Sequence, residues 1–387
     1  MPRGTRDARV LIVLGTSAAW SRGVLRGFTA VARQRGWTLL HYQGVDLRWL
    51  VEVWQPQVIV FQWSLYRDLA PALQPCTLIS LNDDGSEHGV ASVCLDERAI
   101  ARLAATHLVG KGLRDLTTFR FNDGEFAAAR EAAFVAAAGE QGARVVPGWW
   151  VDAAQPPRSL EDPAAITAWL ERLPRPCGVF ACTDSWASVV ARYAQISGLR
   201  IPEDLALIGV DNDTLDCELA SPPLSSVCVP WRSVGQSAAL LVERALAGVP
   251  VAGERIVVPP VDVVPRRSTD VAVVDDPVVE RAMSWIAEHL GRRLTLHAIA
   301  RAAALSRQRL EQRFQAAIGR TVMQELRRAR VDRARQLLAT TQLELPLIAG
   351  QCGFTSAALL SVAFRRETGM PPGAYRRRFR GVHAREE

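Results

Sequence analysis

The sequence predicts two architectures in one chain, an α/β part in two lobes followed by an all-α part. From Arg9 to about Ser268, short apolar runs alternate with longer alanine-rich stretches, and this alternation stops before Pro277. Continuous apolar strands that alternate with helices are typical of a parallel sheet covered on both faces. A length of 387 residues also exceeds that of most single domains, so two lobes and a further domain fit the chain.

The strands of the α/β part are predicted from β-branched and apolar runs, and its helices from the stretches between them. The expected strands are residues 10–14, 38–42, 58–61, 77–81, 90–94, 116–119, 145–149, 178–182, 205–210, 225–229 and 256–258. The expected helices are residues 23–35, 97–109, 126–141, 164–173, 186–197 and 234–247. A signal peptide is the alternative at the start, because three arginines precede the first apolar run. That run is shorter than an h-region of about 7–15 residues, so we expect a buried strand and a cytoplasmic protein.

Composition excludes several classes of protein. Hydrophobic residues make up 49% and charged residues 22%, which excludes a largely disordered chain. The longest apolar runs, such as 10–14 and 257–261, are far shorter than the roughly 18–20 residues that span a bilayer, so no membrane association is expected. The seven cysteines are scattered without a Cys-x-x-Cys pair, which predicts buried free thiols and no metal site.

Charge is distributed unevenly along the chain. Residues 275–387 carry 20 Arg against 11 Asp and Glu, a net charge of +9. Residues 1–274 carry 26 basic against 29 acidic side chains, a net charge of −3. A basic module on a nearly neutral body is typical of a nucleic-acid-binding domain attached to a second function, so double-stranded DNA is the expected partner.

The first part of the basic tail predicts a helix–turn–helix over residues 294–318. Ser306 is a good N-cap for the second helix, and Leu305 and Leu310 occupy the two positions of a hydrophobic staple. Packing of the apolar face turns a polar face outward, as in a recognition helix. The expected DNA contacts are Ser306, Arg307, Gln308, Arg309, Gln312 and Arg313.

A second helix–turn–helix is predicted over residues 345–368, and a linking helix over 322–340 holds the two motifs apart. Gly353 ends the first helix, Thr355 caps the next, and Phe354 and Leu359 form the staple. The exposed first turn is expected to offer apolar contact to thymine methyl groups, and the later arginines to bind phosphates. The expected DNA contacts are Thr355, Ser356, Ala357, Leu360, Arg365 and Arg366. An ordinary amphipathic helix pair is the alternative for each motif taken alone.

An ordered set of residues runs through the tail: Arg330, Val331, Ala334, Leu337, Leu338, Leu345, Ile348, Ala349, Cys352, Gly353, Phe354, Phe364, Arg365, Arg366, Gly369, Pro371, Tyr375 and Arg376. This set resembles the signature of the AraC/XylS family of transcription regulators, over about residues 277–379. The resemblance implies two helix–turn–helix units that enter successive major grooves, a homodimer, and RNA polymerase as a partner. Leu359-Leu360 stand where the family commonly carries an aromatic pair, and Val362 stands at a usual basic position.

The α/β part carries a second resemblance, in the runs 92–112, 180–187, 198–213 and 222–227. These runs are similar to the effector domains of LacI/GalR repressors and to periplasmic sugar-binding proteins. The resemblance implies a two-lobed periplasmic-binding-protein-like effector domain at residues 8–269, a linker at 270–276 and an AraC-type DNA-binding domain at 277–385. The strings 257–260, 266–270 and 276–278 resemble the xylose-responsive members of the AraC/XylS family, in which this uncommon domain order occurs.

Polar and aromatic side chains follow the predicted strands, where doubly wound sheets bind their ligands. Carboxylates accept hydrogen bonds from vicinal hydroxyls, Arg and Asn donate, and an indole stacks on a ring face, so the set suits a small polyol such as a sugar. Asp184 and Asp211 have an alternative role as helix caps, and Arg130, which matches a ligand-binding Arg of the family, has one in a surface ion pair. The expected ligand contacts are Trp20, Arg22, Trp63, Asn82, Asp96, Arg130, Asp184, Asp211 and Asn212.

These features together predict a cytoplasmic, sugar-responsive transcription regulator. The resemblance implies a pentose effector such as D-xylose, no cofactor, and activation of a catabolic operon. A solute-binding protein for transport is one alternative, and a repressor that responds to a different ligand is another. An enzyme is not expected, because the sequence holds no nucleophile elbow, no P-loop and no dinucleotide glycine fingerprint.

Overall fold

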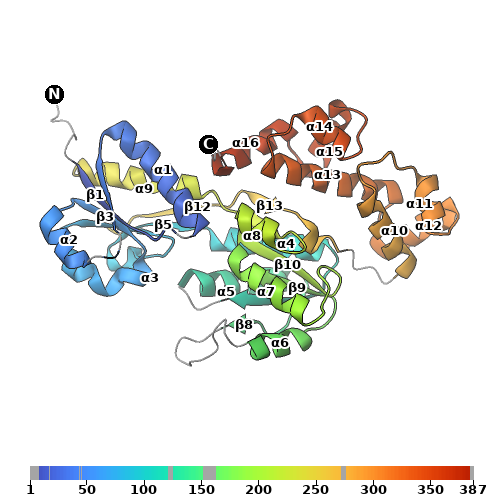
Figure 1. Ribbon diagram of the computed structural model, residues 1–387, viewed down its shortest axis with the longest axis horizontal. Coiled ribbons are helices and arrows are strands. Elements are labelled where there is room, and N and C mark those ends of the chain that lie inside the picture. The colour runs from blue at the N-terminus through green and yellow to red at the C-terminus, as the bar shows by residue number, and fades with distance from the viewer. Residues whose placement is uncertain are drawn as a thin grey trace. The chain divides into compact units, whose positions relative to one another are not determined.

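The computed structural model (Figure 1) describes residues 8–16, 18–42, 44, 46–120, 125–150, 163–271 and 276–383. The chain forms two compact units, each made of several segments. The first unit comprises Met1–Ala101, Phe121–Ala133 and Val229–Val261. The second comprises Arg102–Arg120, Phe134–Cys228 and Asp262–Glu387.

The first unit is built on a six-stranded sheet in the order β12-β5-β4-β3-β1-β2, with every pair parallel. One core cluster of this unit packs strand residues such as Leu11, Ile59 and Phe61 against Leu47 and Val51. Helices α1 and α9 also approach each other closely, since an added methyl group at Gly27 would lie only 2.0 Å from the Arg232 carbonyl oxygen. The strands are β1 (Arg9–Val13), β2 (Thr38–His41), β3 (Val58–Phe61), β4 (Thr77–Leu81), β5 (Ala91–Leu95) and β12 (Arg255–Val258). The helices are α1 (Ala19–Arg35), α2 (Leu47–Trp54), α3 (Trp63–Tyr66) and α9 (Trp231–Leu246), with 3-10 turns at Arg67–Leu73 and Ser86–His88.

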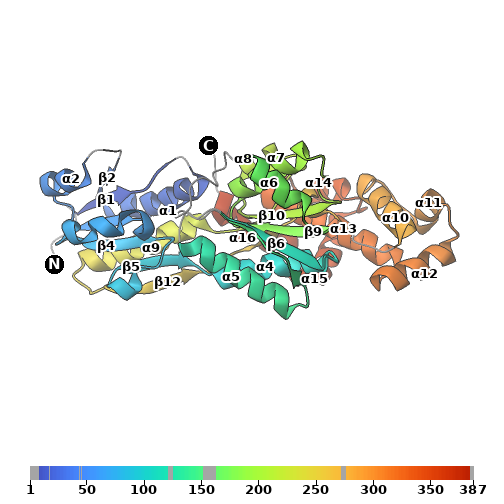
Figure 2. The same ribbon diagram turned by 90° about the horizontal axis from the view of Figure 1, so that it is seen from below.

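The second unit holds a seven-stranded sheet in the order β13-β11-β10-β9-β6-β7, with β8 paired to β6. Figure 2 shows α6, α7 and α8 on one face of this sheet and α4 and α5 on the other. The strands are β6 (Asp115–Arg120), β7 (Arg144–Val145), β8 (Trp149–Trp150), β9 (Cys177–Ala181), β10 (Leu205–Asp211), β11 (Ser225–Cys228) and β13 (Asp262–Val264). Helices α6 (Pro163–Glu171), α7 (Asp184–Ile196) and α8 (Thr214–Leu219) belong wholly to this unit, whereas α4 (Glu97–Gly110) and α5 (Glu125–Glu140) begin in the first unit and end in the second.

The remainder of the second unit is all helical, apart from a 3-10 turn at Arg267–Thr269. Asp276 caps its first helix by accepting the Val278 and Val279 N–H groups, as the Asp-Pro sequence predicts. The long helix α13 joins the α10–α12 group to the α14–α16 group (Figure 1). The helices are α10 (Pro277–Glu288), α11 (Leu296–Ala302), α12 (Arg307–Ile318), α13 (Val322–Thr340), α14 (Leu345–Gln351), α15 (Ala357–Thr368) and α16 (Pro372–His383).

The predicted fold class is confirmed: two doubly wound sheets precede a helical domain with two helix–turn–helix motifs. The expectation of parallel strands throughout is wrong for β13, which pairs antiparallel with β11 and whose three residues carry too short a pattern to predict. The single strand expected at 145–149 is two short strands, β7 and β8, and α2 was not predicted. Within the described ranges, no helix is long and apolar enough to cross a membrane.

Candidate ligand site and nucleic-acid interface

In the first unit, the predicted ligand residues lie at the carboxyl ends of four adjacent strands, β5, β4, β3 and β1. Asn82 directly follows β4 with a φ of 70°, and its buried Oδ1 has no hydrogen-bond partner among the residues described. Trp63 follows β3, and its N–H donates to Ser80 Oγ at 3.2 Å, which links it to β4. A strained Asn with an unsatisfied oxygen at a strand end is typical of a binding position.

The loop after β1 is held by the start of α1. Arg22 donates to the carbonyl oxygen of Thr16 at 3.1 Å, and the Trp20 ring lies 5.6 Å from that of Trp231. Trp63 is 7% exposed and stacks on His88, with ring centroids 5.0 Å apart. Both indoles therefore pack against other rings, which fixes their orientation at the edge of the sheet.

Asp96 and Arg130 have structural partners. Asp96 accepts the Ala99 N–H at 2.9 Å and caps α4. Arg130 is 1% exposed, lies 5.2 Å from the ring of Phe126, and pairs with Glu97 through contacts of 2.5 and 3.1 Å. The surface ion pair considered for Arg130 is instead a buried one, in which Glu97 neutralises the guanidinium.

In the second unit, Asp211 and Asn212 end β10, and Asp184 follows the neighbouring strand β9. The φ angles of Asp211 and Asn212 are 108° and 55°, two consecutive left-handed positions without glycine. Such strain persists only where the surroundings impose it, and it is concentrated at binding sites. Asp211 is partly exposed, whereas Asn212 is buried.

Asp184 is a buried carboxylate with a structural role. It is 1% exposed, and its Oδ2 accepts the Asp213 N–H at 2.8 Å. Gly209 makes room for it, since an added methyl group there would lie 2.2 Å from Asp184 Oδ1. Burial raises the pKa of the Asp184 carboxyl to about 7, although its hydrogen bonds oppose the shift.

Arg266 is a residue that the sequence did not single out. It is 5% exposed and donates to Asn212 Oδ1 at 2.7 Å and to the Leu224 carbonyl oxygen at 2.8 Å. It therefore orients Asn212 from a segment 54 residues away. No local pattern reveals such a partner, because only the fold brings the two together.

The first helix–turn–helix consists of α11 and α12, with Ala304 in the turn at a φ of 55°. Ser306 caps α12, as predicted, by accepting the Arg309 N–H. The side chains predicted to contact DNA are all exposed, and Leu310 and Phe314 are fully buried beneath them. Arg313 differs from its neighbours because it pairs with Asp276 through contacts of 2.6 and 2.9 Å.

The second helix–turn–helix consists of α14 and α15, and three predictions about it are wrong. The N-cap is Ser356, which accepts the Leu359 N–H at 3.2 Å, rather than Thr355. The one-residue shift rotates the helix by about 100°, so that Leu360 is 0% exposed and does not face outward. Leu359 is instead 55% and Val362 69% exposed. For the same reason, Phe354 and Leu359 do not occupy the staple positions.

The remaining residues of this motif lie on its surface or at its start. Thr355, Ser356, Arg365 and Arg366 are exposed, and Ala357 is half-buried at the first position of α15. The exposed face therefore begins with hydroxyl groups, continues through Leu359 and Val362, and ends in two arginines.

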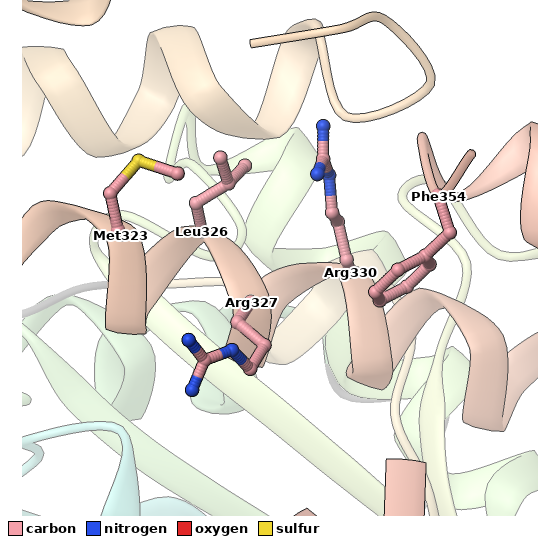
Figure 3. Close-up of a pocket in the computed structure, with 5 residues that line it drawn as sticks. All are labelled: Met323, Leu326, Arg327, Arg330 and Phe354. Carbon is pink, nitrogen blue, oxygen red and sulfur yellow. The ribbon is translucent and has the colours of Figure 1, made fainter. Parts of the chain in front are cut away.

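Helix α13 lies between the two motifs in the sequence and contacts both. A small pocket beside it is lined by Met323, Leu326, Arg327, Arg330 and Phe354 (Figure 3). Figure 3 shows Met323, Leu326 and Arg330 projecting from one side of α13, with Arg327 pointing the other way. Arg330 donates to the Arg292 carbonyl oxygen at 2.8 Å and lies 5.8 Å from the Phe354 ring. One side chain thus contacts the segment before α11 and the segment before α15, which fixes the spacing of the two motifs.

Within the second unit, α13 also contacts the α/β part through charged groups. Lys111 lies 3.7 Å from Asp332 and 3.8 Å from Asp270, and Arg335 pairs with Asp262 at 3.1 Å. Burial alone would raise the pKa of Asp332, but the surrounding basic side chains lower it to about 2. These ion pairs join the strand β13 and the end of α4 to the helix that carries both motifs.

Comparisons with known proteins match two separate regions of the chain. A periplasmic binding protein-like domain matches residues 105–269, and a helix-turn-helix domain matches residues 299–378. The xylose operon regulatory protein of Escherichia coli K12 is 27% identical over 384 residues, which cover 96% of this chain and 97% of that protein. The protein of the same name from Haemophilus influenzae is 32% identical over 217 residues, 56% of each chain. A putative AraC-like transcription regulator of Streptomyces lividans is 39% identical over 102 residues, 26% of this chain and 34% of that protein.

Solved structures extend the likeness to three dimensions. The structure of a xylose-binding transcription activator is 25% identical, has a TM-score of 0.64, and is matched over 97% of this chain and 99% of its own. A LacI family regulator from Arthrobacter in complex with lactose is also 25% identical, with a TM-score of 0.56 over 68% of this chain and 99% of its own.

Proposed function

We propose that this chain, an AraC-type DNA-binding transcription regulator with a periplasmic-binding-protein-like effector domain, binds D-xylose and activates a sugar-catabolic operon. One observation supports the proposal. The chain is similar to xylose operon regulatory proteins over nearly its whole length, so that both parts match and occur in the same order. A regulator of this type acts in the cytoplasm, on double-stranded DNA and together with RNA polymerase.

The strand ends of both sheets suit a small polyol. The unsatisfied Asn82 oxygen can accept a hydrogen bond from a hydroxyl, and the partly exposed Asp211 carboxylate can accept two from vicinal hydroxyls. The Trp63 indole is 7% exposed and stacks on His88, so it shapes the edge of the first unit's sheet rather than offering an open ring face. Within the second unit, Asp184 Oδ2 and Asn212 Oδ1 are engaged with the protein, so these two side chains position the strand end that carries Asp211.

We assign the effector domain to residues 8–269, the linker to 270–276 and the DNA-binding domain to 277–385. Regulation requires that the sugar bind the DNA-competent state more tightly than the alternative state, and a 100-fold preference corresponds to about 2.7 kcal/mol. A homodimer would present two DNA-binding domains to a pair of half-sites.

The first test is thermal unfolding of the purified full chain with a panel of pentoses and hexoses. We expect D-xylose to raise the unfolding temperature, because a ligand at 100 times its Kd stabilises the folded state by about 2.7 kcal/mol. L-Xylose is the matched control, since it has the same composition with inverted stereochemistry. A shift with a different sugar alone would contradict the xylose assignment, and no shift with any sugar would contradict the sugar-effector assignment.

The direction of regulation is tested by transcription in vitro from the target promoter. Activation predicts that the protein with D-xylose increases transcript and that the protein without it does not. A decrease in transcript that D-xylose relieves would make the protein a repressor.

A further inference from the structure

Helix α15 presents an apolar strip on its solvent-facing side. Leu359 and Val362 are three residues apart, lie on the same face and are 55% and 69% exposed. Leu360, Ala363 and Phe364 form the opposite, buried face. These two large aliphatic side chains lie in the first half of the second helix of a helix–turn–helix, which faces outward. Their exposure is typical of a surface that contacts an apolar group of a partner.

Hydrogen-bonding groups near this strip are used within the helix. Ser356 Oγ accepts the Leu359 N–H at 3.2 Å, and Ser361 Oγ donates to the Ala357 carbonyl oxygen at 2.8 Å. No Arg, Asn or Gln lies between Thr355 and Val362 to make a bidentate contact to a purine. After the hydroxyl groups of Thr355 and Ser356, the exposed face as far as Val362 therefore offers aliphatic groups in place of long hydrogen-bonding side chains.

The surroundings of the strip are cationic. Arg365 and Arg366 follow it on α15, and Arg377 and Arg378 are exposed on the adjacent α16. None of these four guanidinium groups has an ion-pair partner in the described part of the chain. An apolar strip bordered by free arginines matches the major groove of DNA, in which thymine methyl groups lie between two rows of phosphates.

We propose that Leu359 and Val362 read the 5-methyl groups of thymine in one half-site, while Arg365 and Arg366 hold the flanking phosphates. This inference rests on the proposed DNA-binding function. It makes the second motif a specificity determinant by van der Waals contact alone.

The probe is a duplex selected from a random-sequence pool by the full-length protein with D-xylose present. Replacing its thymines one at a time by uracil removes only a methyl group. At fixed salt, we expect one or two uracil positions to weaken binding about fourfold each, the value of one buried methyl group. Each position should lose its effect in the variant, Leu359→Ala or Val362→Ala, whose missing side chain contacts that methyl group.

Leu347→Ala is the matched control, since Leu347 is 56% exposed on α14 and lies outside the strip. It should bind like the unmodified protein and keep the uracil effect. Circular dichroism checks that the variants fold. A scan in which no thymine matters, or one in which every uracil effect survives unchanged in both α15 variants, would overturn the inference while DNA binding stands. If the pool yields no duplex, the DNA-binding function itself fails, and the inference fails with it.

Discussion

The two recognition helices share one scaffold and carry different chemistry. Ser306, Leu310 and Phe314 in the first motif correspond to Ser356, Leu360 and Phe364 in the second, always 50 positions apart. Both helices end in a left-handed glycine, Gly319 with a φ of 67° and Gly369 with a φ of 76°. The cap and the buried pair fix how each helix is presented, so the exposed residues are free to differ.

The exposed faces differ completely. Helix α12 presents Arg307, Gln308, Arg309 and Gln312, whose side chains have no partner among the described residues. On helix α15, Leu359 and Val362 stand at the positions that correspond to Arg309 and Gln312. The comparison teaches that the buried positions of a repeated motif are constrained by packing, whereas its exposed positions record what each copy contacts.

The largest effect is expected from removing the shared buried aromatic. Phe314 and Phe364 are both 0% exposed, so Phe314→Ala and Phe364→Ala should each destabilise the helical domain by about 3–5 kcal/mol. Urea unfolding followed by circular dichroism measures both changes. A small loss in one variant and a large loss in the other would show that the two motifs are not equivalent scaffolds.

The second prediction concerns the α/β part, and a pH titration tests it without affecting the two recognition helices. The exposed faces of α12 and α15 carry no group that titrates near neutrality. The folded state raises the pKa of Asp184 from 3.8 to about 7, so it binds a proton more tightly than the unfolded chain does. Stability should therefore fall as pH rises from about 4 to 7. Asp184→Asn should remove this slope in thermal unfolding. An unchanged slope in the variant would assign the titration to another group.

The third effect concerns the turns. Gly353 has a φ of 75°, and an added methyl group would lie 2.3 Å from the Leu290 carbonyl oxygen, so Gly353→Ala should destabilise the domain by about 1–3 kcal/mol. Ala304 occupies the equivalent turn and already holds a methyl group at a φ of 55°. Ala304→Gly should change stability by less than about 1 kcal/mol, and it serves as the matched control. If both variants lowered the free energy of unfolding equally, the close approach at Gly353 would not contribute to stability.

The last effects are expected from single arginines on the DNA surface, and they concern binding rather than stability. Arg307→Ala should weaken operator binding by about 1–3 kcal/mol and relax specificity at one base pair. Arg366→Ala should weaken binding to all sequences alike and lower the salt slope by about 1. Arg313→Ala should have a smaller effect than Arg307→Ala, because Arg313 is already paired with Asp276. Fluorescence anisotropy across a salt series measures all three. Specificity that relaxes in Arg366→Ala and holds in Arg307→Ala would reverse the roles assigned here.

The sequence predicts the architecture better than it predicts the register of α15. A single good cap, Ser306, precedes α12, so its exposed face follows directly. Thr355 and Ser356 both have the chemistry of a cap, and adjacent leucines at 359 and 360 suit either choice. The choice between Thr355 and Ser356 as the cap depends on which leucine packs in the core. Leu360 does so, and this follows from the tertiary structure rather than from the local sequence.

The ligand site shows the same limit. Strand ends are predictable from the alternation of apolar runs and helices, and this places Trp63, Asn82 and Asp211 correctly at the carboxyl edges of their sheets. Which side chains are free to contact a ligand depends on partners remote in sequence. Arg130 is neutralised by Glu97, and Asn212 is held by Arg266.

The contact between Lys111 and Asp332 has a practical consequence. Lys111 is the only lysine in the sequence, and its side chain is 6% exposed between Asp332 and Asp270. The folded chain therefore offers amine-reactive reagents a single side-chain target, which reacts only when that contact opens. The rate at which Lys111 is acylated, followed by mass spectrometry of its peptide, reports the opening of one contact without any engineered label.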